Sequence, residues 1–362
     1  MKATVTRKDL AKAVRLAVAA TEAKASIPVL ASALLVASDD RITIAGTNLM
    51  VGASVSVACK VEKPGRALVV GKQLTSALAG LADGDVSIEA VDGRVELKAG
   101  KSRQKILSGM ADDFPATPTS EGCDLLTIPA PTLLAAFAEG SVSMSTNELS
   151  AHLSCAFLEI ADGILRVVST DGHTLAQRET AFDGSFNGIT IPQKSAIDVR
   201  RTLEAIGSDE LQIGTRLGYL FLVSGGIEVS IKLGDGNFIP YKQVIPHSKK
   251  RRASVPREAT LAAIKRVLTN IDDASPAAQL SLADGTLTIR SSSKDAEASD
   301  AVDVDYAGDD FRISANGAYL VRALGAMAHD EVWIDTSSEL DPIVFRGVDS
   351  TESVHVVMPV RQ

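Results

Sequence analysis

The segment Phe157-Leu158-Glu159-Ile160-Ala161-Asp162-Gly163-Ile164-Leu165-Arg166-Val167-Val168 joins two alternating apolar runs through an Asp-Gly step. Such a step is a strong signal for a β-hairpin, because both central positions of the tight turn need a positive φ. The same pattern predicts hairpins around Asp284-Gly285 and Asp39-Asp40. Asp40, Asp162 and Asp284 lie 122 residues apart in each step, which indicates an internal repeat.

A second landmark recurs at the same interval. Helix-like segments begin near Lys72, Lys194 and Asn316, again 122 residues apart, and each follows a β-like segment. An earlier helix in each repeat follows Val5, Ile128 and Val255, with Pro129 and Pro256 suited to a first helical turn. More strands follow the second helix, and each repeat ends in an apolar-Pro step at residues 114–115, 239–240 and 358–359.

The repeat predicts the fold class and the domains. Helices beside antiparallel strands make an α+β unit, and the chain of 362 residues holds three of them. The expected domains are residues 1–121, 122–247 and 253–362. Linkers are expected near Thr117–Gly122 and His247–Arg252. Lys249-Lys250-Arg251-Arg252 is interpreted as a solvated interdomain linker, with contact to DNA or a partner as the alternative.

The composition is that of an ordinary globular protein, with 45% hydrophobic and 23% charged residues. No stretch reaches the roughly 18 apolar residues of a membrane span, and the N-terminus lacks the apolar core of a signal peptide. Cys59, Cys123 and Cys155 have no CxxC spacing, which argues against a disulfide framework and a zinc site. A cytoplasmic location, without a membrane partner, is expected.

The net charge of −8 argues against nucleic-acid binding until the positions of the charges are considered. The six predicted helices, residues 7–20, 71–81, 131–140, 192–206, 256–271 and 316–328, hold twelve basic and five acidic residues, a net of +7. The remainder therefore carries −15. If the helices share one face, that face suits a polyanion bound along its phosphates. The alternative is that Lys and Arg solvate exposed helix surfaces.

Several motifs together resemble the bacterial DNA polymerase III beta subunit family, the sliding clamps. They are Thr170-Asp171-Gly172-His173-Thr174-Leu175-Ala176, Phe238-Ile239-Pro240-Tyr241, Val244-Ile245-Pro246 and Val356-Val357-Met358-Pro359-Val360-Arg361. Residues 27–30, 46–49 and 113–115 add to the likeness, which runs along the whole chain in the family's order. This chain is similar to a divergent or accessory member.

The resemblance implies a non-catalytic processivity factor without cofactor or metal. Family members are head-to-tail homodimers whose six similar domains form a ring, with helices lining the hole and sheets outside. The expected partners are double-stranded DNA, the replicative polymerase alpha subunit, the clamp loader and other replication and repair proteins with clamp-binding motifs. The protein is then expected to associate with the nucleoid during replication.

The resemblance also implies two sets of site residues. A peptide-binding cleft between the second and third domains would include Leu153, Thr170, Gly172, His173, Thr174, Leu175, Ile239, Val244, Val357, Met358, Pro359, Val360 and Arg361. The residues expected to face DNA are Lys12, Arg15, Lys24, Lys72, Lys194, Arg200, Arg201, Lys265 and Arg266. Apolar walls with a flexible Met suit varied peptides, and a few polar groups orient them.

The chain departs from the family pattern at several positions. Ser150-Ala151-His152-Leu153-Ser154-Cys155 stands where the family often has an Arg-Tyr-Tyr-Leu-Asn-Gly-like segment whose tyrosines touch DNA. Thr174 and Gln243 stand where Arg is common, and Ile239 where Pro is common. The peptide preference of the cleft is therefore expected to differ.

An enzyme acting on phosphorylated substrates is the alternative function. Asp171-Gly172-His173 could be imagined as a catalytic or metal dyad, but no HExxH or HxxEH arrangement accompanies it. Ser169 has no G-x-S-x-G elbow around it. The sequence thus provides no convergent acid, base and nucleophile, and His173 is interpreted as a residue lining the cleft.

Overall fold

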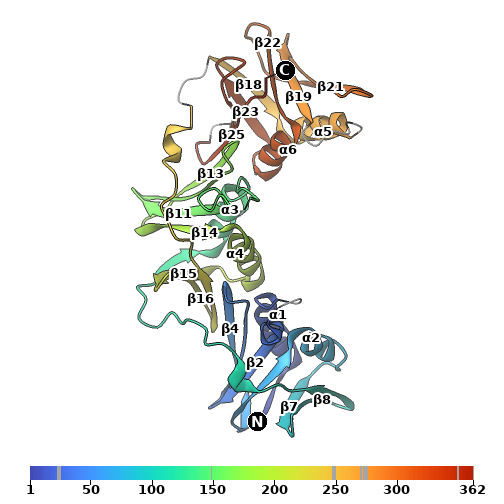
Figure 1. Cartoon of the computed structure of the whole chain (residues 1–362), viewed down its shortest axis with the longest axis vertical. Coiled ribbons are helices and arrows are strands. Elements are labelled where there is room, and N and C mark those ends of the chain that lie inside the picture. Colours follow the sequence, from blue (N-terminus) through green and yellow to red (C-terminus); the bar gives the residue numbers. More distant parts are fainter. Residues whose placement is uncertain are drawn as a thin grey trace. The chain divides into compact units, whose positions relative to one another are not determined.

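A computed structural model describes residues 1–22, 26–147, 149–246, 250–269, 271, 276–348 and 350–361 (Figure 1). Each predicted repeat contains a strand, a helix, further strands, a second helix and a final set of strands. The six helices found in these residues lie where the sequence predicts them, with ends shifted by at most a few residues. The α+β prediction is therefore confirmed for each repeat.

The elements have the following bounds. The first repeat contains β1 (Lys2–Thr6), α1 (Arg7–Ala19), β2 (Ser32–Ser38), β3 (Arg41–Thr47), β4 (Val51–Ala58), β5 (Lys60–Lys63), β6 (Gly65–Val70), α2 (Gly71–Ala79), β7 (Asp85–Val91), β8 (Arg94–Ala99) and β9 (Ser102–Leu107). The second contains β10 (Leu126–Pro129), α3 (Ala130–Gly140), β11 (Cys155–Ala161), β12 (Ile164–Thr170), β13 (Thr174–Ala181), β14 (Phe186–Pro192), α4 (Gln193–Ile206), β15 (Glu210–Arg216), β16 (Tyr219–Ser224) and β17 (Ile227–Lys232). The third contains β18 (Arg251–Pro256), α5 (Arg257–Leu268), β19 (Ala277–Ala283), β20 (Thr286–Ser292), β21 (Glu297–Asp303), β22 (Phe311–Asn316), α6 (Gly317–Ala326), β23 (Glu331–Thr336), β24 (Ile343–Gly347) and β25 (Ser353–Val357).

The strands pair across the repeats. The chain divides into two compact units, Met1–Leu133 with Ile197–Leu233 and Leu134–Ala196 with Gly234–Gln362, so the middle repeat is shared between them. In the first unit, β17 pairs antiparallel with β4, giving the sheet β10-β15-β16-β17-β4-β3-β2-β6 beside the sheet β5-β1-β7-β8-β9. In the second, β13 pairs with β25, giving β14-β11-β12-β13-β25-β24-β23-β18 beside β21-β20-β19-β22.

The hairpin turns follow the Asp-Gly prediction in two repeats of three. Asp162 and Gly163 have φ of 55° and 72°, and Asp284 and Gly285 have φ of 46° and 70°. In the first repeat Asp39 has φ of 51°, whereas Asp40 is not among the described residues with positive φ. No glycine follows Asp39, and a side chain disfavours a second left-handed position, so this turn takes another form.

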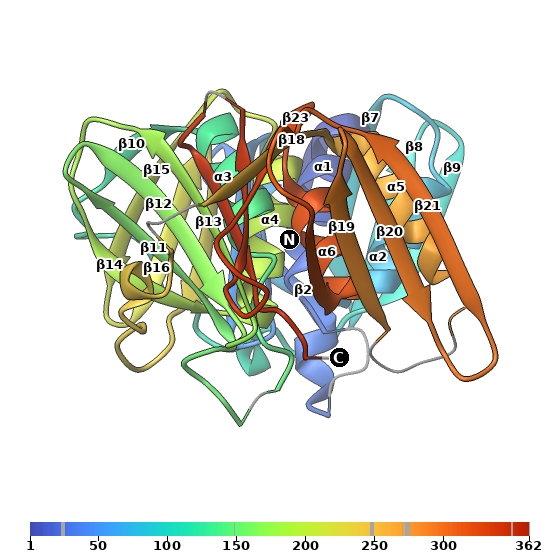
Figure 2. The same ribbon diagram turned by 90° about the horizontal axis from the view of Figure 1, so that it is seen from above.

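Helices pack closely on the strands that precede and follow them. In the first unit α1 lies against β3, β4 and α2, and a Cβ at Gly46 would meet the Ala17 carbonyl oxygen at 2.0 Å. A Cβ at Gly140 of α3 would meet the Val167 carbonyl oxygen of β12 at 2.2 Å, so a glycine permits the same helix–strand approach in the second repeat. In the second unit α5 packs on α6, β20 and β21 (Figure 2).

Aliphatic side chains dominate the core, as the low aromatic content predicts. The core of the third repeat gathers Val255 and Ile264 with Leu287, Leu320 and many similar residues between α5, α6 and both sheets. No helix in the described part of the chain is long and apolar enough to span a bilayer.

The linker prediction for Lys249–Arg252 is wrong for its last two residues. Arg251 and Arg252 form the first residues of β18 and pair with Thr336 and Asp335 of β23. Their guanidinium groups stack on Phe311 and Trp333 at 4.4 and 4.7 Å. Basic residues alternating across an edge strand can pack on aromatic rings, which a charge run alone does not reveal. Lys249 lies outside the described residues.

Candidate functional site

The motif Thr170–Thr174 folds the turn between β12 and β13 by local hydrogen bonds. The Asp171 Oδ1 atom accepts from the backbone N–H groups of His173 and Thr174 at 2.9 and 2.6 Å. The Thr170 hydroxyl donates to the Thr174 carbonyl oxygen at 2.6 Å. Gly172 has φ of 86°, a conformation that favours glycine. The sequence of this motif therefore fixes its own turn.

Arg322 of α6 binds this turn from the third repeat. Its Nη2 atom donates to Asp171 Oδ2 and to Thr174 Oγ1, both at 2.5 Å. The guanidinium group also lies 5.0 Å from the centre of the Tyr319 ring. Burial alone would raise the pKa of Asp171, but hydrogen bonds from Arg322 and from the turn outweigh it and hold that pKa below its usual value. Arg322 thus joins α6 to the β12–β13 turn through a charged hydrogen bond.

The C-terminal segment adds a third side to this region. The backbone N–H of Met358 donates to the His173 carbonyl oxygen at 2.9 Å, directly after β25 pairs with β13. Pro359 forms an isolated antiparallel β-bridge with Ala315, and the backbone N–H of Val360 donates to the Ser314 carbonyl oxygen at 2.8 Å. The His173 and Tyr319 rings stack with centroids 6.2 Å apart. The turn, α6 and the C-terminal segment therefore meet.

Apolar side chains remain exposed around this meeting point. Met358, Val360 and Val244 are 43%, 38% and 52% exposed. Covering these side chains with a partner would remove apolar surface from water and so stabilise the complex. Deeper in the molecule, Leu175 packs in a cluster with Ile239, Val344 and Val356, and a Cβ on Gly172 would lie 3.9 Å from Leu153.

The predicted cleft residues differ in how far their side chains are exposed. The side chain of Val357 is fully buried in the core of the third repeat, because it points to the opposite sheet face from Val356. Only its backbone could border a cleft, so the membership of Val357 stays a prediction about the backbone. Arg361 is exposed, and no hydrogen bond or ion pair to another described residue holds it. Thr170 and Thr174 are buried within the turn.

The sequence reasoning missed Tyr319 and the role of Arg322. Tyr319 was not singled out, and Arg322 was counted only among the basic helix residues. Their spacing of three residues on one helix places both side chains on the same face, which is a usable signal. Sequence alone, however, does not say that this face meets Asp171, which is 151 residues away.

A buried polar network lies beside this region. Glu139 of α3 is 4% exposed and accepts from the Ser353 hydroxyl, while His355 Nε2 lies 3.3 Å and Arg178 Nη1 3.3 Å from its carboxylate. Burial would raise the pKa of Glu139, but these partners, His355 first, hold it below the usual value. The network ties α3 to β13 and β25.

The predicted DNA-facing residues are on helix surfaces. Lys24 lies outside the described residues, and the other eight are exposed: Lys12, Arg15, Lys72, Lys194, Arg200, Arg201, Lys265 and Arg266. Some of these carry an acidic neighbour: Arg200 pairs with Glu204, Arg201 with Asp198 and Arg266 with Asp300. Pairs this exposed are worth little and can exchange for a phosphate.

Other basic helix residues do not belong to such a surface. Arg7, the first residue of α1, donates to the carbonyl oxygens of Leu78 and Ala79 at the end of α2. Arg257, the first residue of α5, donates to Leu324 near the end of α6 and to His329. Both satisfy carbonyl groups that a helix end leaves open. Arg7, Arg257 and Arg322 were included among the twelve basic helix residues. Their guanidinium groups are already bound within the protein, so fewer basic residues are available to a polyanion than that count indicates.

Within the described residues no three His, Cys, Asp or Glu side chains are close enough to hold a metal ion.

Comparison with known proteins gives one consistent result. Profiles of the DNA polymerase III beta subunit match in order: its N-terminal domain at residues 1–118, its central domain at 127–240 and its C-terminal domain at 242–361. The beta sliding clamp of Pseudomonas aeruginosa is 26% identical over 368 residues, covering 99% of both chains. That of Caulobacter vibrioides is 27% identical over 374 residues and covers 100% of both.

A solved structure agrees along the whole chain. The crystal structure of the DNA polymerase III subunit beta from Pseudomonas aeruginosa superposes with a TM-score of 0.91 at 26% identity, covering 100% of both chains. With all three domain profiles matched in the family's order and full-length relatives of the same name, the chain belongs to the DNA polymerase III beta subunit family of sliding clamps.

Proposed function

We propose that this protein is the non-catalytic processivity factor of a bacterial DNA polymerase, a head-to-tail dimeric ring that encircles duplex DNA. The observation that carries the proposal is the ordered match of three beta subunit domains over residues 1–361. For these domains we propose the boundaries 1–121, 122–247 and 253–362. A clamp of this kind acts in the cytoplasm, on the nucleoid.

The strand order supports ring closure. In both junctions within the chain, the third strand after the first helix of one repeat pairs with the last strand of the next repeat, β4 with β17 and β13 with β25. The third repeat leaves the equivalent strand β21 at a sheet edge, and the first repeat leaves β9 at another. Pairing β21 with β9 of a second copy repeats the same junction and removes both edges.

The register predicts which residues would meet at that junction. We treat β21 as the equivalent of β13 and β9 as the equivalent of β25, and align each pair by the register of its own hairpin. If β21 and β9 then pair as β13 and β25 do, Glu297 lies opposite Lys105 of the second copy and Ser299 lies opposite Arg103. The exposed side of β9 thus carries basic residues and that of β21 carries Glu297 and Asp303. Opposite charges directly across a strand pair are stabilising, whereas an antiparallel pairing of two β9 edges would oppose like charges.

The helix surfaces would hold the DNA. Exposed Lys and Arg on α1, α2, α4 and α5 offer contacts to phosphates without reading bases. The residues proposed to face DNA are Lys12, Arg15, Lys24, Lys72, Lys194, Arg200, Arg201, Lys265 and Arg266. Acidic neighbours of Arg200, Arg201 and Arg266 would keep each contact weak, which suits a ring that moves along the duplex.

The region where the β12–β13 turn, α6 and the C-terminal segment meet would be the peptide cleft. Exposed Met358, Val360 and Val244 supply apolar walls, and His173 and Arg322 supply polar groups. The proposed occupants are short segments of the replicative polymerase alpha subunit, the clamp loader and other replication and repair proteins. Thr174, Ile239 and Gln243, where the family often differs, would shift the peptide preference.

Retention on DNA of different topology tests the proposal. After loading, the protein should stay on a nicked circular plasmid and be lost when the plasmid is linearised, because a ring slides off free ends. The Lys105→Glu variant is the control, since a weakened junction should abolish retention on both. Equal retention of the wild-type protein on circular and linear DNA would contradict encirclement.

A further inference from the structure

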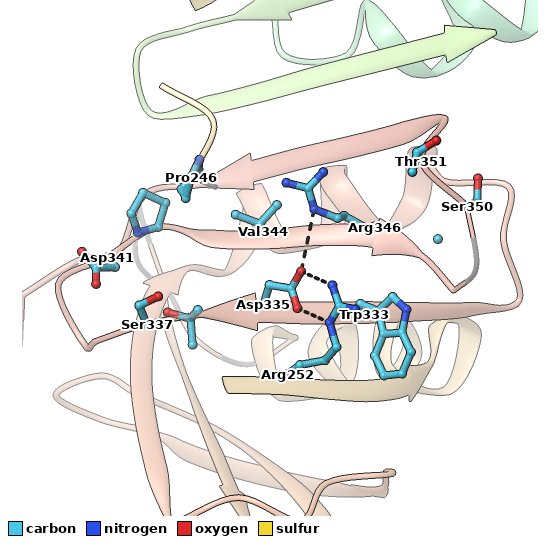
Figure 3. Close-up of a pocket in the computed structure, with 13 residues that line it drawn as sticks. Pro246, Arg252, Trp333, Asp335, Ser337, Asp341, Val344, Arg346, Ser350 and Thr351 are labelled. Carbon is cyan, nitrogen blue, oxygen red and sulfur yellow. Dashed lines mark hydrogen bonds and ion pairs between the residues drawn. The ribbon is translucent and has the colours of Figure 1, made fainter. Parts of the chain in front are cut away.

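A polar pocket of about 470 Å³ lies on the outer face of the sheet strands β18, β23 and β24 (Figure 3). Arg252 pairs across the strands with Asp335, and Trp333 pairs with Arg346, so these four side chains share one face. The alternate residues Val332 and Ile334 point into the core. The four side chains therefore form the floor of a pocket that the clamp function described above does not use.

Arg252 and Arg346 share a single carboxylate in this pocket. The Nε and Nη2 atoms of Arg252 donate to the two oxygens of Asp335 at 2.6 and 2.7 Å. Arg346 Nε lies 3.7 Å from the same carboxylate, beyond hydrogen-bond distance. The Asp335 side chain is 5% exposed, and Arg252 also stacks on Trp333. Arg252 therefore makes both hydrogen bonds to Asp335, and Arg346 is a more distant partner of the same carboxylate.

Two guanidinium groups share one carboxylate here, so Arg252, Arg346 and Asp335 together carry one net positive charge. The contact of Arg346 with Asp335 is the only ion pair or hydrogen bond that its guanidinium makes with the described residues. Burial lowers the pKa of Arg346, Asp335 offsets part of this effect, and the neighbouring charge of Arg252 lowers it further. Figure 3 shows the two terminal nitrogens directed away from Asp335. A half-buried fork of donors is thus available to an anion.

The pocket adjoins the proposed cleft. Val344 lines the pocket and packs in the same apolar cluster as Leu175 and Ile239 of the cleft. Pro246, also in the lining, lies two residues after the exposed Val244. A peptide anchored in the cleft therefore needs to extend only a few residues along this surface to reach Arg346.

We propose that Arg346 binds the carboxylate of an acidic residue that flanks the apolar anchor of a clamp-binding peptide. The inference rests on the proposed function of the cleft. One carboxylate would balance the net positive charge of Arg252, Arg346 and Asp335 on the pocket floor, and its planar oxygens suit the Arg fork. A dianionic phosphate would exceed this balance by one charge, and Asp341 on the rim repels a dianion more strongly than a carboxylate.

The test uses fluorescently labelled peptides from the C-terminus of the host's replicative polymerase. In one series a single Glu is placed at each position flanking the apolar anchor, and in the matched series Gln replaces it. Dissociation constants are measured for the wild-type protein, Arg346→Gln and the control Arg290→Gln, which removes an exposed arginine of β20 outside the pocket.

The wild-type protein should bind one Glu peptide roughly tenfold more tightly than its Gln match, the effect of one charged hydrogen bond. Arg346→Gln should lose this preference while binding the Gln peptide unchanged, and Arg290→Gln should keep it. The melting temperature of Arg346→Gln should equal that of the wild-type protein, because Arg252 alone holds Asp335.

Several outcomes would overturn the inference. They are the absence of a Glu preference in the wild-type protein, the same preference in Arg346→Gln, and a clearly lowered melting temperature of that variant, which would make Arg346 a structural residue. Inorganic phosphate alone raising the melting temperature of the wild-type protein but not of Arg346→Gln, without a Glu preference, would show a site for free anions instead. If neither peptide series binds any protein, the cleft itself is misplaced and the inference falls with it.

Discussion

Replacing Arg322 with Met should destabilise the second unit by weakening the contact between α6 and the β12–β13 turn. Methionine keeps an apolar stem over Tyr319 but removes the hydrogen bonds to Asp171 and Thr174. Asp171 and Arg322 side chains are 11% and 30% exposed, so the pair is neither fully buried nor fully solvated. A hydrogen bond to a charged group contributes about 1.5–3 kcal/mol, and partial exposure reduces the expected loss to about 1–2 kcal/mol.

The dependence of this loss on pH follows from Asp171. Its folded-state pKa lies below the ordinary value, so its stabilising contribution is present above the unfolded pKa of about 3.9 and is lost as the pH falls through the folded pKa. Arg322→Met moves the folded pKa back toward the unfolded one. The difference between the two proteins should therefore be full at pH 7 and should shrink below about pH 4.

Fluorescence of the single tryptophan measures the effect in the right unit. Trp333 is in β23 of the same unit as Arg322 and Asp171, so its emission during urea denaturation reports the free energy of unfolding there. Arg322→Met, Asp171→Asn and the double variant complete a cycle, with Arg290→Met as the control for loss of an exposed charge. A coupling of about 1 kcal/mol is expected. Additive effects of the two changes would refute the interaction.

Three further predictions concern the ring and the cleft. Three helix residues are changed to Glu together: Lys72, Lys194 and Arg201. The dimer should persist by size exclusion, while the slope of log affinity for DNA against log salt becomes shallower by about 0.9 per lost phosphate contact; an unchanged slope would place these residues on an outer face. Lys105→Glu and Glu297→Lys should each shift the 37.9 kDa chain from dimer to monomer in sedimentation, and the two variants mixed should recover a dimer. If the mixture stays monomeric, the inferred register is incorrect. Deleting Met358 through Gln362 removes the backbone bonds to His173 and Ser314 and should weaken polymerase-peptide binding at least tenfold in fluorescence anisotropy, with the dimer intact; undiminished binding would place the cleft elsewhere.

Local chemistry made much of the fold predictable from the sequence. The 122-residue spacing of the Asp turns and helix starts gives three α+β repeats and locates the six predicted helices, of which α6 is capped by Asn316. The Thr170–Thr174 turn also follows from its own residues, since Asp171 and Gly172 supply the hydrogen bonds and the backbone freedom that it needs. These features depend on contacts within a few residues, which sequence patterns record directly.

The tertiary structure decided which distant surfaces meet. Pairing of β4 with β17 and of β13 with β25 divides the middle repeat between two units, although the repeat pattern suggests three separate ones. Strand facing decides that Val357 points into the core, and the packing of α6 beside the β12–β13 turn decides that Arg322 reaches Asp171. Strand facing also brings the side chains of Arg252 and Arg346 to the carboxylate of Asp335. The sequence alone had placed Arg252, as part of a basic run, in a linker. A one-residue change of register would turn Val357, Arg252 and Arg346 to the other face of the sheet, and a local pattern of apolar and charged residues carries no record of the partner strand.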